Sequence, residues 1–176
     1  TKYPLGEKEK IEYREGVNYI PDPEPQVPEG AAFFNGYLQY RNTFFWDKKA
    51  MKEAPGDYTK AVIYHWLHGS AISNENGVAS PMLESYKMPL ENRVWYKYQN
   101  QDLGPFSYQG MSSRPSYIGR VLDDSTTQLD TYFYNSIGKD TLYIDPLGRK
   151  TRYIYDNNKV DLLQVWQYGK TGPQTL

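Results

Sequence analysis

The sequence predicts an all-β protein built as an array of antiparallel β-hairpins, with at most one short helix. Aromatic residues make up 16% of the 176-residue chain and include 18 tyrosines, and aromatic side chains favour strands over helices. The 14 glycines and 12 prolines are spread along the length, and these residues form tight turns. Towards the C-terminus, turn signals recur about ten residues apart, which is the spacing of short strands joined by turns.

Composition excludes several classes of protein. The 20 basic and 21 acidic side chains give a net charge of −1, so we expect neither nucleic acid nor an anionic membrane as a partner. The chain is 39% apolar and has no run approaching the roughly 20 residues of a membrane-spanning helix. It has no cysteine, which excludes disulfides, thiolate metal sites and a thiol nucleophile.

Residues 1–20 are predicted to form a hairpin-type repeat. Gly6 lies seven residues before Tyr13, as Gly148 lies seven residues before Tyr155, and each glycine follows a Pro-Leu pair. Residues 15–16, Glu-Gly, then supply the next turn signal. Residues 21–30 carry four prolines. Because proline cannot donate to a strand ladder, we expect a linker or a strap that covers a sheet edge.

Residues 31–115 are predicted to be an aromatic, β-rich connecting region. Asp47 is a helix cap for two helical turns that stop at Pro55 and Gly56. Residues 69–80 are rich in Gly, Ser and Asn and are expected to be a mobile loop, and residues 100–115 are mostly loop. The expected strands are residues 37–46, 61–67, 82–88 and 93–99.

Residues 116–176 show the clearest periodicity. A glycine followed by a cation occurs at Gly119, Gly138 and Gly148, at intervals of 19 and 10 residues. Asn158, followed by Lys159, continues the series, because Asn can adopt the left-handed backbone of a turn glycine. The strands expected between these turns are residues 128–135, 141–145, 149–156 and 160–168, in which aromatic side chains two apart share a face.

Two stretches in this part resemble a known family. Residues 134–139 read YNSIGK and residues 145–156 read DPLGRKTRYIYD, and both resemble the tyrosine-aspartate (YD) repeats of RHS proteins, the second over twelve consecutive positions. The stretch that begins with residues 35–42 and ends with residues 92–96 also resembles the connecting sequence found within bacterial RHS proteins. The structural repeat residues that the resemblance indicates are Leu5, Gly6, Tyr13, Gly119, Arg120, Tyr132, Tyr134, Gly138, Lys139, Asp145, Pro146, Gly148, Arg149, Tyr153, Tyr155 and Asp156.

The resemblance implies a fold and a role. In RHS proteins the hairpin sheet spirals into a hollow shell that encloses a polypeptide, often a toxin domain, until delivery. It therefore implies a secreted or cell-surface scaffold whose partners are flanking repeats of the same polypeptide and an enclosed cargo. The copies depart from the pattern: Arg14 follows Tyr13, Asn135 follows Tyr134, and the 157–158 turn is one residue short. No motif closing an RHS core is present, so we expect an internal section of a longer polypeptide.

The residues offer no catalytic or metal site. His65 and His68 would share a face on a helix and could ligate a metal, but the apolar β-branched surroundings favour a strand with the two rings on opposite faces. Residues 123–125, Asp-Asp-Ser, could bind a hard cation but lack the loop spacing of such a site, and a turn is favoured. No carboxylate pair, serine motif or phosphate-binding loop is singled out. We therefore predict no enzyme, no cofactor and no metal.

Two alternative functions stay open at this stage, and one of them is a hydrolase that uses carboxylates, since the 21 acidic side chains do not exclude a two-carboxylate site. Exposed Tyr and Trp rings could form a platform for an extracellular carbohydrate-binding module, with cell-surface glycans as partners. Regular placement at strand spacing favours packing instead, because a platform needs only a few exposed rings. A single hairpin cannot bury its aromatic face, so successive hairpins must add to a common sheet. Cations at the turns, such as Arg149 and Lys159, are expected to pair with acids on neighbouring turns and to set the register.

Overall fold

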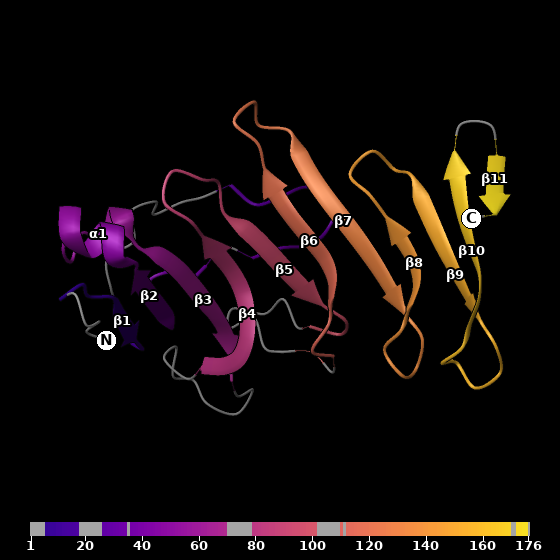
Figure 1. The fold of residues 1–176 in the computed structure, drawn as a ribbon, viewed down its shortest axis with the longest axis horizontal. Helices are drawn as coiled ribbons and strands as arrows, with labels where there is room; N and C mark the ends of the chain where they lie inside the picture. The colour runs from indigo at the N-terminus through magenta and orange to yellow at the C-terminus, as the bar shows by residue number, and fades with distance from the viewer. Residues whose placement is uncertain are drawn as a thin grey trace.

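The described part of the computed structural model forms one antiparallel β-sheet, which confirms the predicted all-β class. It covers residues 6–17, 26–34, 36–69, 79–101, 110, 112–169 and the backbone of 172–175. Eleven strands lie in sequence order from β1 to β11, so that each pairs only with its neighbours in the chain. Figure 1 shows them side by side, with the two ends of the sheet open.

The first half of the sheet contains the helical segments. Its elements, in order, are β1 Lys10–Arg14, β2 Asn42–Trp46, α1 Lys48–Glu53, the 3-10 turn η1 Tyr58–Lys60, β3 Val62–His68, β4 Ala79–Lys87 and β5 Val94–Tyr98. The side chain of Asp47 accepts a hydrogen bond from the backbone N–H of Ala50 at 2.7 Å and caps α1 as predicted. The helix ends before Gly56, which has a φ of +83°.

The second half is an uninterrupted series of hairpins. Its strands are β6 Pro115–Val121, β7 Thr127–Tyr134, β8 Asp140–Ile144, β9 Lys150–Tyr155, β10 Leu162–Gly169 and β11 Gly172–Thr175. The four strands predicted from residue 128 onwards are confirmed to within two residues at their ends. The predicted loops at 69–80 and 100–115 fall mostly outside the described residues, and Ala79 and Ser80 already belong to β4.

Two predicted elements near the N-terminus are corrected. Residues 37–46 are not one strand, because Tyr37 and Arg41 have φ values of +60° and +54° and only Asn42–Trp46 is extended. A tight turn at Glu15 and Gly16 is also wrong: β1 pairs with β2, and the chain between them runs from residue 15 to residue 41. The backbone N–H of Arg41 returns to the carbonyl of Glu15 at 3.0 Å, which closes this long connection.

The sheet has two chemically different faces. The covered face includes a row of directly paired residues that crosses six strands, Asn42, His65, Ser85, Trp95, Gly119 and Leu129. The tyrosine face lies on the opposite side and includes Tyr64, Tyr86, Tyr96, Tyr132 and Tyr143. Successive side chains of a regular strand point to opposite faces, so residues two apart in the sequence share a face.

A proline-containing segment crosses the covered face, and we call its described residues, 26–34, the strap. The side chain of Pro28 is fully buried, and the backbone N–H of Glu29 donates to Thr127 Oγ1 on β7 at 2.9 Å. In Figure 1 the purple trace passes β6 and β7 before it returns to β2. The predicted linker or strap at residues 21–30 is thus a covering of the sheet face, as far as residues 26–30 show, and not of its edge.

The core lies between the covered face and the segments placed on it. One cluster joins Phe44, Trp46, Ala61 and Ile63, with Tyr58 packed edge-on against Phe44 at 4.7 Å between ring centroids. A second cluster joins Leu38 and Trp95, with Val27 and Phe33 of the strap packed against it. The strap and the α1 region therefore bury the N-terminal half of the covered face.

Candidate functional site

Three hairpins of the second half, β6–β7, β7–β8 and β8–β9, share one type of turn, whereas in the β9–β10 turn the backbone N–H of Asp156 donates to the carbonyl of Asp161, one residue further along. In the β7–β8 turn, the backbone N–H of Gly138 donates to the carbonyl of Asn135, and that of Asn135 donates to the carbonyl of Lys139, both at 2.9 Å. The β8–β9 turn makes the same two bonds with its own residues, Asp145, Gly148 and Arg149. This arrangement is a type I turn followed by a left-handed residue, a common three-residue hairpin connection.

The fourth turn residue carries the left-handed backbone. Gly138 and Gly148 have φ values of +82° and +77°, as their placement in the repeat predicts. In the β9–β10 turn the left-handed residue is Lys159 (φ +64°) and not Asn158, so the assignment of Asn158 was wrong. The left-handed residue is the fourth of the turn. The first residue of this turn is Asp156, whose carbonyl accepts from the N–H of Lys159 at 3.0 Å, so the fourth is Lys159. Ser125 has the equivalent place in the β6–β7 turn, with a φ of +66°.

The first turn residue is held by its own side chain. Oδ1 of Asp145 accepts from the backbone N–H groups of Leu147 at 3.0 Å and Arg149 at 2.8 Å. Oδ1 of Asn135 makes the corresponding pair of bonds in the preceding turn. Asp and Asn stabilise turns in this way by replacing a backbone acceptor. Pro146 lies directly after Asp145, at a position where a fixed φ near −65° suits a type I turn.

Gly119 and Arg120 are not turn residues, which corrects their assignment to the Gly-cation turn series. Both lie within β6, where Gly119 pairs with Trp95 and Leu129 on its two sides. A β-carbon on Gly119 would lie 3.0 Å from Cβ and Cγ of Pro28. The glycine therefore allows the strap to approach the sheet closely, and the turn itself falls at residues 122–126.

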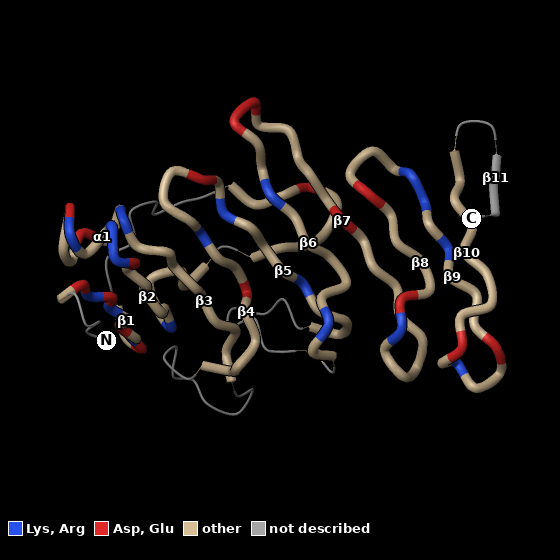
Figure 2. Tube along the Cα trace, viewed as in Figure 1, with Lys and Arg blue, Asp and Glu red and all other residues tan. Residues whose placement is uncertain are grey.

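The cations at the turns pair differently from the prediction. Arg149 forms its ion pair within its own turn, where its Nε lies 2.5 Å from Oδ2 of Asp145. Lys159 does reach the neighbouring turn, but its Nζ donates to the hydroxyl of Ser136 at 2.9 Å and not to an acid. Nδ2 of Asn135 also donates to the carbonyl of Lys159 at 3.0 Å. Polar contacts, and not ion pairs, connect these two turns. Figure 2 shows the charged residues that gather at the turns.

The repeat tyrosines lie together on the tyrosine face. Tyr132 and Tyr134 have near-parallel rings with centroids 6.5 Å apart, and Tyr143 on β8 lies 5.1 Å from Tyr132. The hydroxyl of Tyr143 donates to Oδ1 of Asp130 at 2.6 Å, and this bond raises the pKa of Tyr143 well above its usual range. Burial raises the pKa of Tyr134 to about 12. These phenols are neutral and held in place at physiological pH.

The remaining residues of the predicted repeat lie at both ends of the sheet. Tyr13 lies on β1 opposite Thr43 and is half exposed, and Gly6 has the left-handed φ of +80° that its match with Gly148 predicts. Tyr153 and Tyr155 lie on β9, opposite Val165 and Leu162 of β10. Leu5 lies outside the described residues.

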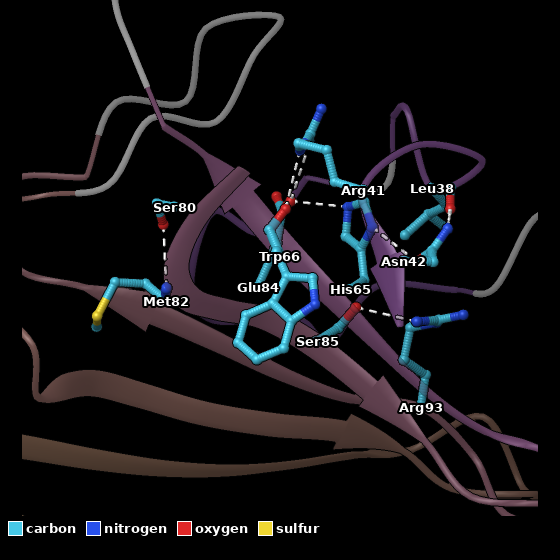
Figure 3. Close-up of polar contacts among 10 residues, drawn as sticks. All are labelled: Leu38, Arg41, Asn42, His65, Trp66, Ser80, Met82, Glu84, Ser85 and Arg93. Carbon is cyan, nitrogen blue, oxygen red and sulfur yellow. Dashed lines mark hydrogen bonds and ion pairs between the residues drawn. The ribbon is translucent and has the colours of Figure 1, made fainter. Parts of the chain in front are cut away.

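A buried polar cluster lies between β2, β3 and β4, and sequence reasoning missed it. Nε2 of His65 lies 3.0 Å from Oε2 of Glu84, and Nη2 of Arg41 lies 3.8 Å from the same oxygen. The side chains of His65 and Glu84 are 0% and 3% exposed. On the other side of the ring, Nδ1 of His65 lies 3.1 Å from Oδ1 of Asn42. Figure 3 shows these four side chains directed towards one another.

A β-bulge places Glu84 in this cluster. On β4, Ser85 pairs with His65 and Leu83 pairs with Trp66, so that Glu84 is the extra residue of the strand. A bulge re-aims a side chain that strict alternation would direct to the other face. Glu84 and Ser85 are therefore both buried next to His65, although they are adjacent in sequence. Period-two alternation cannot reveal this, and the one available signal was an acidic residue in the middle of a predicted strand.

The hydrogen bonds of the cluster determine how many protons it holds. Nδ2 of Asn42 donates to the carbonyl of Leu38 at 2.6 Å, so its Oδ1 faces His65 and accepts the proton of Nδ1. The contact between Nε2 and Oε2 then requires one further proton, carried by the imidazole or by the carboxyl group. Burial lowers the pKa of His65, while the hydrogen bond to Glu84 acts in the opposite direction. Arg41 contributes a positive charge 3.8 Å from Oε2 of Glu84.

A cavity of about 560 Å³ lies on the tyrosine face near β3, β4 and β5. Its apolar wall includes Tyr64, Tyr86 and Tyr96, whose rings follow one another with centroid distances of 6.5 and 6.2 Å. Asp47 and Lys60 supply charges at its margin. This cavity is open to solutes, whereas the His65 cluster is not.

The described residues contain no group of three or more acidic or histidine side chains arranged to hold a metal ion. His65 and His68 both lie on β3 and are fully buried. Asp124 belongs to the β6–β7 turn, where its Oδ1 accepts from the backbone N–H of Thr126 at 3.0 Å. Within the part of the chain that the structure describes, no helix has the length and hydrophobicity needed to cross a membrane.

Comparison with known proteins gives no identification. No protein-family model matches the sequence. A search of curated proteins also finds no significant match.

Proposed function

We propose that this chain is a structural scaffold, a section of the wall of an RHS-type β-shell that encloses a polypeptide cargo. The observation that carries the proposal is the repetition of one turn geometry at three successive hairpins, from the β6–β7 turn to the β8–β9 turn. Each repeat adds a strand to the same sheet, and the sheet order begins at β1 and ends at β11. An open sheet of this kind can be extended by flanking repeats at both edges.

The chemistry of the site supports a scaffold over an enzyme. The paired histidine and carboxylate, His65 and Glu84, are out of reach of any substrate because both side chains are almost completely buried. Buried polar networks of this type are used to fix a unique packing arrangement. The carboxyl of Glu84 thus contributes to the register of β3 and β4, where the bulge occurs.

The test is an image of the longer polypeptide that contains this chain. The shell proposal expects a hollow particle by electron microscopy and a cargo segment that resists protease until the wall is opened. A solid or elongated particle, or a cargo cleaved as fast as an unprotected peptide, would contradict it. The isolated chain, with unpaired outer strands, is expected to self-associate in sedimentation experiments. A cooperatively melting monomer would count against the wall-section proposal.

Carbohydrate binding is the second candidate, and the cavity lined by Tyr64, Tyr86 and Tyr96 favours it. Titration of tryptophan fluorescence with oligosaccharides would give a saturable shift reported by Trp66, which stacks on Tyr64 with 6.5 Å between ring centroids. The Tyr86→Ala variant is expected to abolish that shift while the chain stays folded. Trp95 cannot report on this cavity because it is 1% exposed on the covered face.

A further inference from the structure

The covered face continues past the strap onto β7, β8 and β9. Phe133 lies four residues after Leu129 on β7, so the two side chains project from the same face. Phe133 pairs with Leu142 on β8, and Leu142 pairs with Arg152 on β9. Phe133 is 46% exposed, whereas Trp95, which the strap covers, is 1% exposed. One sheet face is thus covered at β5, β6 and the start of β7, and open from Phe133 on β7 to β9.

The open part of this face is hollowed. A groove of about 530 Å³ is lined by Phe133, Thr141, Leu142, Lys150, Arg152 and Tyr168. Apart from the hydroxyl groups of Thr141 and Tyr168, its polar groups are the two cations, which lie two residues apart on β9 and therefore share a face. No ion pair involves Lys150 or Arg152 among the described residues. The groove combines apolar surface with positive charge.

The strap shows what kind of chain this face accepts. Val27 and Phe33 pack against the Trp95 cluster, and Pro28 lies against Gly119. The residues that the structure places on the face include one proline, Pro28, and one acid, Glu29, and residues 21–30 together carry three acids and four prolines but no cation. A proline-rich segment is extended before it binds, so it loses little conformational entropy on an apolar, aromatic surface.

We propose that the groove on β7–β10 binds a second extended segment of the same chemistry as residues 21–30, acidic and proline-containing. Continuity supports this occupant, because the groove extends the face on which the strap lies. Charge supports it as well, because Lys150 and Arg152 complement the acids of such a segment. The segment comes from outside residues 26–34, since these already cover β5–β7.

The probe for this site is a fluorescently labelled peptide of residues 20–31, titrated with the whole chain and followed by anisotropy. Saturable binding is expected. The double variant Lys150→Glu with Arg152→Glu is expected to weaken it by about tenfold, the effect of two lost exposed charge pairs. A peptide with Asn or Gln in place of its acids is expected to bind the unchanged chain as weakly as the original peptide binds the double variant.

Lys139→Glu is the control, because it reverses a single charge at an exposed position in the β7–β8 turn. It is expected to leave binding unchanged, and a circular dichroism spectrum that matches that of the unchanged chain establishes that each variant is folded. A photo-crosslinker in place of Val27 of the peptide is expected to label the tryptic fragment 160–170, which contains Tyr168. Absence of saturable binding, indifference to the double variant, or labelling of the tryptic fragment that contains Gly119, through displacement of the resident strap, would each overturn the proposal.

Discussion

Pro28 of the strap lies directly against Gly119 in the middle of β6, so close that a β-carbon on Gly119 would be 3.0 Å from Cβ and Cγ of Pro28. Gly119 is paired on both sides, with Trp95 and Leu129. Glycine in a strand interior weakens the strand but permits close approach of another segment. The contact between these two residues therefore fixes where the strap crosses the sheet.

Gly119→Ala is expected to lower the free energy of unfolding by about 1–3 kcal/mol, as overpacking of a tight contact does. Urea denaturation measures this change, and faster proteolysis within residues 26–34 is expected to accompany it. The control is the double variant Gly119→Ala with Pro28→Ala, which is expected to destabilise less than the two single changes together. Strict additivity would show that the two side chains do not meet.

Gly148→Val is expected to lower the free energy of unfolding by about 1–2 kcal/mol, because a side chain resists the left-handed φ of +77°. Gly16→Val is a matched control. No atom lies within 4 Å of an added β-carbon at either glycine, and only Gly148 has a positive φ. Thermal or urea denaturation compares the two variants. Equal midpoints would contradict the turn geometry described for the β8–β9 hairpin.

His65→Ala is expected to cost about 3–5 kcal/mol, because it leaves the buried carboxyl of Glu84 without its closest partner. Glu84→Gln is expected to cost less, since an amide N–H can donate to Nε2 of a neutral His65 without the additional proton. Urea denaturation of both variants gives the comparison. A larger loss for Glu84→Gln than for His65→Ala would disprove the proposed proton arrangement.

Glu12 gives stability that depends on pH. Hydrogen bonds from Lys10 foremost, and also from Arg14 and Tyr58, lower the pKa of Glu12 from 4.5 to about 2. A lowered carboxyl pKa contributes stability that is fully present above 4.5 and is lost as the pH falls from 4.5 towards 2. We expect about 1 kcal/mol near neutral pH, because the partners are partly exposed.

Glu12→Gln is expected to remove that contribution near neutral pH and to match the unchanged chain near pH 2. Unfolding free energies across this pH range measure the difference. Glu53→Gln on the exposed side of α1 serves as the control and is expected to follow the unchanged chain throughout. A stability gap for Glu12→Gln that did not close in acid would contradict the assigned ion pairs.

Local signals in the sequence were sufficient for the hairpins. The Asp145 and Gly148 positions determine a turn by themselves, through a side-chain cap and a left-handed backbone, and the strands beside it follow. The same holds for α1, which Asp47 caps. These features depend on residues a few positions apart, and the resemblance to YD repeats rests on them.

Long-range features could not be predicted in the same way. Gly119 precedes a cation as the turn glycines do, yet a proline 91 positions earlier in the sequence explains its presence. Glu84 joins His65 only because a bulge interrupts the alternation of β4. In both cases the deciding contact involves distant residues or a local irregularity of pairing, and neither leaves a periodic pattern.

The strap also has a consequence for the order of folding. The bond between Glu29 and Thr127 joins residues 98 positions apart, whereas each hairpin from β6 to β10 joins neighbours. Loop-closure entropy delays distant contacts relative to near ones. On a ribosome that adds about 5–20 residues per second, the strap would emerge at least roughly 5 s before its docking strands exist. Nascent chains would therefore carry Pro28 and Val27 uncovered for that interval, which makes this segment a natural contact for chaperones during synthesis.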